Sequence, residues 1–423
     1  MRLHFAALAA LVVLLCAAFP AHATDRISLN DAFDRVAKSH PDLRLFDPRA
    51  QGLAAELDRA SLRPALVAGA SVENAFGTGA ASGLDGAELT LTLASVLERG
   101  GKLDARRVLA NSRIDALAVE RETRRLDLLA EVARRYLALV AAQKQGEIAQ
   151  LDIGQRQRTL AAARVRLQAG ASPESVVLTA QAALARAELD RARAMQRLKA
   201  ARQHLAALWG ERDPDFDVVV NDPLALPNIA SFAELGDLLD RTPELAQFAG
   251  ERRIREARLQ LARSERTPDL DWQVGVRHLQ ATDDFALVGS VSIPLGSRRR
   301  AEPGIRAADA DLASLEIERE SKGLSLYSTL AEAHGRYLIA QLEVQRLRDD
   351  ILPKLGKAEA AAERAYRGGA ISYLEWAQLQ SERTATRKQQ LEAALDAQRA
   401  LIEIQRLTGQ AFMAGSTTQG STP

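Results

Sequence analysis

Residues 166–181 read Arg166-Leu-Gln-Ala-Gly170-Ala-Ser-Pro-Glu174-Ser-Val-Val-Leu-Thr-Ala-Gln181, and residues 365–380 read Ala365-Tyr-Arg-Gly-Gly369-Ala-Ile-Ser-Tyr-Leu-Glu375-Trp-Ala-Gln-Leu-Gln380. In each stretch one helical pattern ends and another begins within a few residues. Gly170 and Gly369 supply the left-handed conformation that closes a helix. Each stretch is therefore predicted to form the tip of a helical hairpin, and the two glycines lie 199 positions apart.

The residues that follow each glycine are typical of helix starts. Ser172 is predicted to cap the first return helix, with Pro173 at its first position and Glu174 near the positive end of the helix dipole. Ser372-Tyr-Leu-Glu375 has the pattern of a capping box. Capping alone accounts for a carboxylate at either place, and a role in gating or ion selectivity is the alternative for both glutamates.

The same offset recurs beyond the tips. Leu208-Trp-Gly210 matches Leu407-Thr-Gly409 at 199 positions, and His40-Pro-Asp-Leu43 matches Thr242-Pro-Glu-Leu245 at 202. A period of about 200 residues is too long for a solenoid unit. We therefore predict a duplicated half-molecule, with a signal peptide at 1–23, a first repeat at 24–210, a connector at 211–230, a second repeat at 231–410 and a disordered tail at 411–423.

Both repeats contain short helices, two strands, a long helix and a return helix, in that order. The first has strands at about 66–76 and 87–96, a long helix at about 102–168 and a return helix at about 173–208. The second has strands at about 270–278 and 285–293, a long helix at about 303–367 and a return helix at about 372–407. A 67-residue helix spans about 100 Å, so it must pack lengthwise against other helices.

Helix-breaking residues are expected at equivalent positions of the two long helices. Pro353 lies inside the second long helix and is predicted to kink it. Gly154 occupies the corresponding position of the first long helix, 199 residues earlier.

The start of the chain predicts export from the cytoplasm. Arg2, an apolar run and Ala21-His-Ala23 form a secretory signal peptide with its cleavage site. Cys16 is the only cysteine, and Leu15 stands where a lipoprotein site would have a small residue, so lipidation is not expected. No other apolar stretch reaches the ~18 residues of a membrane helix.

The four strands leave two interpretations open. Their lengths suit transmembrane strands, but four strands cannot close a barrel, since the smallest membrane barrels have about eight. In lipid, several chains would have to pool their strands, because an open sheet edge is not tolerated there. Three chains would supply twelve strands and two would supply eight. The alternative is a small soluble β-subdomain at the end of a helical bundle.

Composition and motifs argue against several other functions. Lys+Arg 56 against Asp+Glu 55 leaves no basic excess for nucleic acid. Gly100-Gly-Lys102 lacks the spacing of a phosphate-binding loop. His40, His204, His278 and His334 are scattered without metal-ligand spacing. We therefore expect no enzyme activity, no cofactor and no metal site, which does not argue against metal export because a duct need not bind its cargo.

The duplicated order of elements resembles the TolC family of outer-membrane efflux proteins. Ala365-Tyr366-x-x-Gly369-x-x-Ser372-x-x-Glu375 is similar to that family's repeated tip pattern. Leu97-Glu-Arg-Gly-Gly-Lys102 and Ile351-Leu-Pro353 are similar to segments of the CzcC-like branch, which is tied to heavy-metal efflux. The resemblance extends from about residue 28 to 410.

This resemblance implies a mostly α protein with a small β part. Its long helical hairpins would form a periplasmic α-barrel, and its four strands would contribute to a trimeric twelve-stranded β-barrel in the outer membrane. The expected role is the passive outer-membrane channel of a tripartite efflux system, and heavy-metal cations, drugs or polypeptides could all be cargo. The expected partners are a periplasmic adaptor protein, an inner-membrane pump, outer-membrane lipid and two further copies of the chain.

The resemblance also assigns residues. The tip residues expected to contact the adaptor are Gly170, Ala171, Ser172, Gly369, Ala370 and Ser372. The aperture residues expected at the narrow end of the tunnel are Glu174, Tyr366 and Glu375. The first repeat departs from the family pattern, because Val176 stands where an aperture acid is expected. The alternative function is a periplasmic adaptor or coiled-coil scaffold without a membrane barrel.

Overall fold

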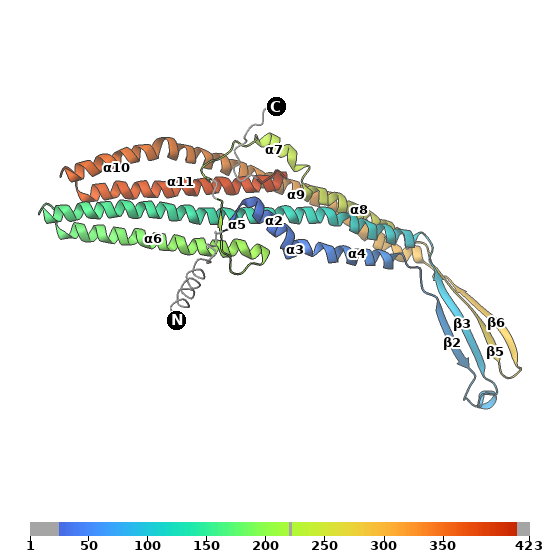
Figure 1. Cartoon of the computed structure of the whole chain (residues 1–423). Coiled ribbons are helices and arrows are strands. Elements are labelled where there is room, and N and C mark those ends of the chain that lie inside the picture. Colours follow the sequence, from blue (N-terminus) through green and yellow to red (C-terminus); the bar gives the residue numbers. More distant parts are fainter. Residues whose placement is uncertain (1–24, 220–221, 413–423) are drawn as a thin grey trace, which may run out of the picture.

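The computed structural model describes residues 25–219 and 222–412. The predicted signal peptide, Cys16 and the tail from residue 413 lie outside the described residues. The chain forms a long rod of helices with a small sheet at one end and two hairpin tips at the other (Figure 1).

Two long helical runs extend from the sheet to the tips. The first is α5 (Lys102–Gln168), over the residues for which the sequence predicts one helix. The second consists of α9 (Ser297–Arg346), a π-helical turn (Leu347–Ile351) and α10 (Leu352–Arg367). Within the described residues, no helix is both long and apolar enough for a membrane crossing.

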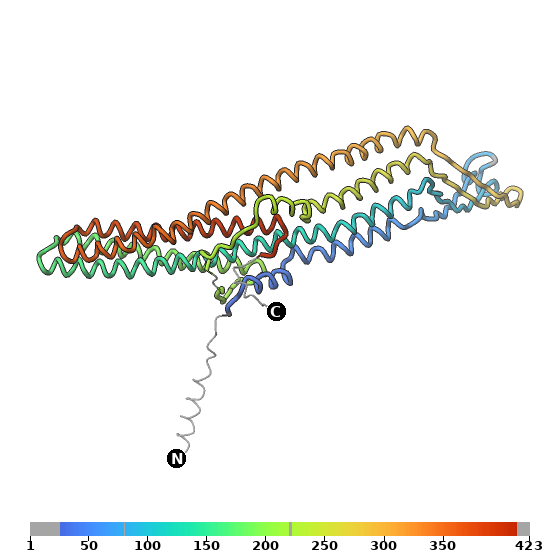
Figure 2. Tube along the Cα trace, turned by 90° about the horizontal axis from the view of Figure 1, so that it is seen from above, coloured from blue at the N-terminus to red at the C-terminus, as the bar shows by residue number. Residues whose placement is uncertain are grey.

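Shorter helices pack beside the two long runs, so that four helices lie side by side in each half of the rod. The middle of the rod, where these two halves meet, is called the waist. The return helices α6 (Glu174–Ala206) and α11 (Tyr373–Thr408) pack along the long runs from the tips to the waist. From the waist to the sheet, α4 (Phe46–Ala60) and α8 (Pro243–Ser264) take their place. Figure 2 shows α4, α5, α8 and α9 side by side in this half.

The second long run differs from the sequence-based prediction at its start and near Pro353. Its helix begins at Ser297 instead of about 303, so Pro303 lies inside the helix and not at its start. The irregularity expected at Pro353 takes the form of the π-helical turn that immediately precedes it. The matching break at Gly154 is absent, since glycine keeps its N–H and α5 continues through it.

The waist contains elements that sequence patterns did not reveal. The strands β1 (Asp25–Ile27) and β4 (Phe216–Val218) pair in parallel across 191 residues of chain, and β4 lies in the segment predicted as a plain connector. Each strand has only three residues, too few for a periodic signal. Around them lie α2 (Leu29–Ser39), α3 (Pro41–Arg44), the short 3₁₀ turn Ala207–Trp209 and α7 (Phe232–Leu239).

A buried tyrosine anchors each repeat at the waist. The Tyr136 hydroxyl donates to the carbonyls of Ile27 and Val219 at 3.1 and 2.7 Å, and that of Tyr337 donates to the Pro227 carbonyl. Burial raises the pKa of both phenols to about 12. The two tyrosines thus fasten the irregular segments at the chain start and the connector to α5 and α9.

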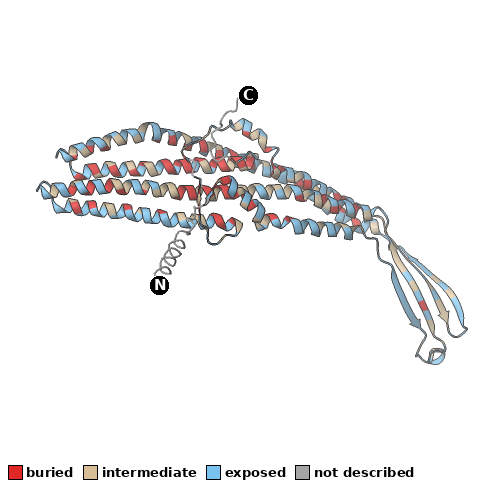
Figure 3. Ribbon diagram, viewed as in Figure 1, coloured by how far each residue is buried: buried red, intermediate tan, exposed pale blue. Residues whose placement is uncertain are grey.

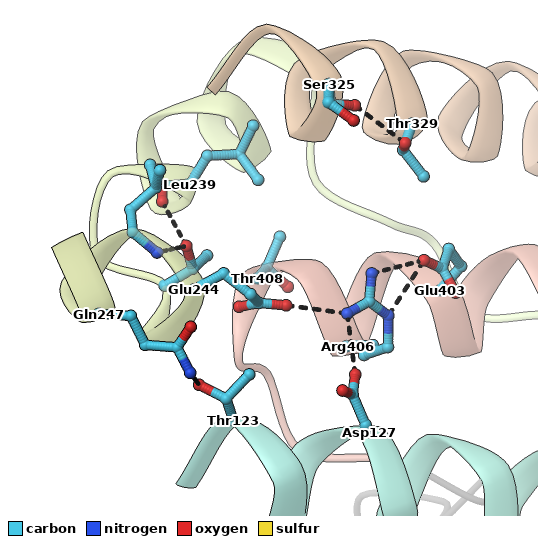
Figure 4. A network of polar contacts seen from close by, with 12 residues as sticks. Thr123, Asp127, Leu239, Glu244, Gln247, Ser325, Thr329, Glu403, Arg406 and Thr408 are labelled. Carbon is cyan, nitrogen blue, oxygen red and sulfur yellow. Dashed lines mark hydrogen bonds and ion pairs between the residues drawn. The ribbon is translucent and has the colours of Figure 1, made fainter. Parts of the chain in front are cut away.

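A partly buried ion network joins the two repeats at the waist (Figure 4). Arg406 of α11 contacts Asp127 of α5 at 3.1 Å, Glu244 of α8 at 2.8 Å and Glu403 at 2.9 Å. Arg134 of α5 contacts Glu403 at 2.6 Å. The side chain of Glu244 is only 9% exposed, so its charge depends on Arg406 for compensation.

The sheet has the antiparallel order β2-β3-β5-β6, which unites the hairpins of both repeats. Its strands are β2 (Val67–Glu73), β3 (Glu88–Leu97), β5 (Leu270–Leu279) and β6 (Asp284–Ser292), and the glycine-rich loop after β2 contains a 3₁₀ turn (Gly79–Ala81). The strand predicted over 66–76 is shorter because Asn74 and Phe76 take positive φ angles that end it.

The two faces of the sheet differ in polarity. In register, Leu91 lies beside Val276, which lies beside Leu287, and all three side chains are exposed. The opposite face carries polar residues, among them Thr90 and Arg277, and Arg277 bonds to Thr90 and Glu88. Figure 3 shows that nearly all of the sheet is uncovered in the single chain. No helix or strand among the described residues therefore covers the apolar face.

Candidate functional site: the hairpin tips

Both tips close with the same backbone turn. Gly170 and Gly369 have φ angles of +69° and +83°, as predicted for left-handed glycines. The N–H of Ala171 donates to the Arg166 carbonyl at 2.8 Å, and that of Ala370 to the Ala365 carbonyl at 2.9 Å. Together with the bonds from the glycine N–H groups, these form Schellman motifs.

The starts of the return helices differ between the tips. The capping box predicted at Ser372 is present, with Glu375 N–H donating to Ser372 Oγ at 3.3 Å and Ser372 N–H donating to Glu375 at 2.9 Å. The prediction for Ser172 was wrong. α6 begins at Glu174 after Pro173, whose extended ψ of 157° keeps it outside the helix and moves Ser172 too far back to cap it.

The exposed surface of the tips contains most of the predicted contact residues. Gly170, Ala171, Gly369, Ala370 and Ser372 are exposed, and Ser172 is half-buried. Glu174 and Glu375 are also exposed. The tip end of the rod therefore presents small residues and two carboxylates to whatever surrounds it.

Tyr366 is placed differently from the other predicted aperture residues. Its side chain is 2% exposed and packs against Trp376, with ring centroids 5.2 Å apart. Burial raises the pKa of the Tyr366 phenol, against the opposing effects of Arg166 and Ser172. Although Ser172 lies nearby, the buried hydroxyl makes no hydrogen bond of acceptable geometry with any described residue. Within one chain, the hydroxyl does not bridge to the other hairpin.

Arg166 joins the two tips instead. Its Nη1 donates to the Tyr366 carbonyl at 2.5 Å, and its Nη2 donates to the Ala171 carbonyl at 3.3 Å. The guanidinium also lies over the Tyr366 ring, 4.9 Å from the centroid. No sequence pattern indicates this contact, because the partner carbonyl is 200 residues away and any residue type would offer one.

Polar side chains link α5 to α11 a few turns above the tips. Thr159 Oγ1 donates to Gln380 at 2.9 Å, and both side chains are buried. Arg156 donates to Ser381 at 3.0 Å, and Thr384 donates to Asp152 at 3.1 Å. The polar residues on α5 recur at helical spacing, which is the signal that could have revealed this buried seam.

No group of His, Cys, Asp or Glu in the described part of the chain has the arrangement of a metal site. The tips thus offer surface, charge and a mechanical link between hairpins.

Comparison with known proteins identifies the class to which this rod with its tips and sheet belongs. The model of the family described as Outer membrane efflux protein matches residues 43–211 and 235–410, one segment in each repeat. The chain belongs to this family. It is an outer-membrane channel of a tripartite efflux system and extends from the outer membrane into the periplasm. The family is one of transport channels and not of enzymes.

Curated relatives cover most of the chain. It is 27% identical over 326 residues to the cobalt-zinc-cadmium resistance protein CzcC of Cupriavidus metallidurans, covering 76% of this chain and 73% of the relative. It is 26% identical over 347 residues to the pyoverdine export outer membrane protein OpmQ of Pseudomonas putida, covering 75% and 69%.

Solved structures share the fold. CusC superimposes with a TM-score of 0.76 at 18% identity and covers 90% of this chain and 92% of its own. The open state of MtrE from Neisseria gonorrhoeae gives a TM-score of 0.72 at 18% identity, covering 92% and 91%. The adaptor and scaffold alternatives are set aside by these findings.

Proposed function

We propose that three copies of the chain form an outer-membrane duct for heavy-metal cations. The observation that carries the proposal is the pairing of an uncovered apolar sheet at one end of the rod with exposed carboxylates at the other. The similarity to a cobalt-zinc-cadmium resistance protein supports this cargo. The duct would conduct passively, without cofactor or catalysis.

The sheet supports assembly into a closed barrel. β2 and β6 are its edges, and each leaves one row of backbone groups unpaired. Because an unpaired edge in lipid costs several kcal/mol for each group, β2 of one chain would pair with β6 of the next. Twelve strands from three chains would close the ring, with the face of Leu91 and Val276 toward lipid.

Two substitutions on the sheet test this orientation. Leu91→Arg places a charge on the apolar face, which costs about 2–4 kcal/mol at the middle of a membrane. Gln273→Arg places the same charge on the polar face as a control. We expect detergent extracts of outer membranes to yield trimer for Gln273→Arg and much less for Leu91→Arg. A parent that is monomeric by light scattering would refute the barrel.

The tips would contact the periplasmic adaptor and narrow the tunnel. Gly170, Ala171, Ser172, Gly369, Ala370 and Ser372 are proposed as adaptor contacts, since most of them are exposed where the rod ends. Three copies of Glu174 and of Glu375 would place six carboxylates around one axis. Such a ring repels anions and concentrates cations, and the effect fades as salt screens it.

Tyr366 would hold the narrow end shut. Its hydroxyl is buried and has no hydrogen-bond partner among the described residues, so a neighbouring chain would supply one only after the tips rearrange on assembly. Tyr366→Phe should raise conductance in planar bilayers without loss of thermal stability, because it removes an unsatisfied buried hydroxyl. Unchanged conductance would restrict Tyr366 to packing.

Metal tolerance tests the cargo. A strain that lacks the gene should become sensitive to cobalt, zinc and cadmium, and the parent gene should restore tolerance. The competing cargo is a siderophore, favoured by the similarity to a pyoverdine exporter. Normal metal tolerance together with a loss of secreted siderophore would replace the metal proposal with that one.

A further inference from the structure

A group of exposed arginines surrounds the end of the sheet where strands join helices. The group, here named the arginine belt, consists of Arg63, Arg99, Arg298, Arg299 and Arg300. Arg63 precedes β2, Arg99 follows β3, and the other three form the start of α9 after β6. Strand register places these junctions at one level, since Leu97 pairs with Leu270 and Ser292 pairs with Asp271. Figure 1 shows this end of the sheet against the helices.

The belt has no internal counter-charge. None of its five side chains makes an ion pair or hydrogen bond with another described residue, whereas neighbouring basic residues at this level are paired. Lys102 contacts Asp269 at 2.7 Å, and Arg266 contacts Glu302 at 3.0 Å. Asp269 and Glu302 are thus already paired with cations outside the belt.

Three consecutive arginines are unfavourable where they stand. Arg298, Arg299 and Arg300 lie in the first turn of α9, which contains no acidic residue. Cations at the positive end of a helix dipole raise the free energy of the fold. An external anion bound at this position would offset the cost.

Apolar side chains accompany the belt. Leu295, just before α9, is 86% exposed, and Leu62 and Leu66 beside Arg63 are 67% and 64% exposed. The far end of the sheet differs, because its residues include Asp85, Asp283 and Asp284 and no belt arginine. The belt arginines thus all lie where the strands meet the helices, whereas Arg277, near the far end of β5, is paired with Glu73 and Glu88.

We infer that the arginine belt binds the phosphate headgroups of anionic phospholipids in the periplasmic leaflet of the outer membrane. The guanidinium groups match phosphate in charge and in hydrogen-bond geometry. The exposed leucines would enter the acyl region next to them, continuing the apolar face of the sheet. The inference rests on the proposed barrel and adds a lipid class that fixes the depth of the channel in the membrane.

Lipid binding to the detergent-purified full chain tests the belt. Native mass spectrometry would count bound phosphatidylglycerol and phosphatidylcholine across a titration. We expect the parent to prefer phosphatidylglycerol, and the triple variant R298Q/R299Q/R300Q to lose about 100-fold of that affinity at low salt, from about fivefold for each arginine. The preference should also weaken from about 0.01 M to 1 M salt, as the Debye length falls from about 30 to 3 Å.

Two further triple variants serve as controls. R191Q/R253Q/R319Q removes the same charge from exposed helix positions away from the belt and should keep the preference. R298K/R299K/R300K keeps the charge and should retain most of it. Soluble glycerol phosphate should not displace the lipid, because it has no acyl chains to insert beside the leucines.

Different outcomes would contradict lipid binding by the belt and the proposed trimeric barrel. A trimeric parent without preference for phosphatidylglycerol, or equal losses in both glutamine triples, would overturn the belt and leave the barrel standing. Displacement by glycerol phosphate would also overturn it, by showing a site for free anions. Failure of the barrel has a different signature, since the parent itself would then not be recovered as a trimer.

Discussion

The link through Arg166 offers the sharpest test of how the two hairpins act together. Arg166→Gln shortens the side chain and removes its charge, so both carbonyls and the Tyr366 ring lose their partner. Hydrogen bonds from a charged donor contribute about 1.5–3 kcal/mol, and a cation over an aromatic ring contributes about 0.5–1 kcal/mol at an exposed site and about 2 kcal/mol when desolvated. Because Arg166 is half-buried and one of its bonds is long at 3.3 Å, we expect a total of about 2–4 kcal/mol.

That energy sets the equilibrium between joined and separated tips. A loss of about 3 kcal/mol shifts it by roughly 100-fold toward separation. Amide hydrogen exchange at the ends of α5 and α10 should then speed up by about that factor, while exchange at the waist should not change. In planar bilayers the variant should open more often than the parent.

Arg164→Gln is the matched control, because Arg164 is exposed, lies two residues away on α5 and has no side-chain partner among the described residues. It should exchange and conduct like the parent. If Arg166→Gln also exchanges like the parent at both tips, the contacts of Arg166 contribute no net stability and the reasoning is refuted.

Three further predictions concern the backbone of a tip, its charge and the waist. Gly369→Val should weaken adaptor binding while the trimer stays intact, because the left-handed conformation costs a residue with a side chain about 1–2 kcal/mol. Gly154→Val is the control, since Gly154 lies in a helix with open space around it and its replacement should not affect adaptor binding. Equal adaptor binding by the two variants would contradict this prediction. Glu375→Gln keeps the capping box, so we expect a reduced preference for cations at low salt that is caused by the lost charge alone. An unchanged preference would leave Glu375 with a capping role only. Arg406→Gln should lower thermal stability by about 2–4 kcal/mol at neutral pH. Burial is the largest single influence on Glu403 and raises its pKa, but Arg406 and Arg134 together lower it further, so the Glu403 pKa lies below the usual 4.5. The parent therefore loses this stabilisation as pH falls through the lowered pKa, and circular dichroism melts should show the stability difference between parent and variant narrowing there.

Local features of the fold could be predicted because neighbouring residues determine them. A glycine with a positive φ angle closes a helix through bonds to residues five or fewer positions away, as at Gly170 and Gly369. The capping box at Ser372 likewise needs only Glu375 three residues later. Where two local preferences competed, the prediction was wrong, since the extended conformation of Pro173 prevented Ser172 from capping α6.

The sequence by itself thus determined the duplicated halves, the hairpin tips and the alternating strands, all of which follow from short-range periodicity and turn chemistry. Only the tertiary structure decided which distant groups meet. It paired β1 with β4, placed Arg166 beneath a carbonyl 200 residues away, and buried Tyr366 although the sequence suggested an aperture. The physical reason is that these contacts depend on how the long helices align over their whole length. A backbone carbonyl or a three-residue strand has no side-chain pattern that would indicate its partner.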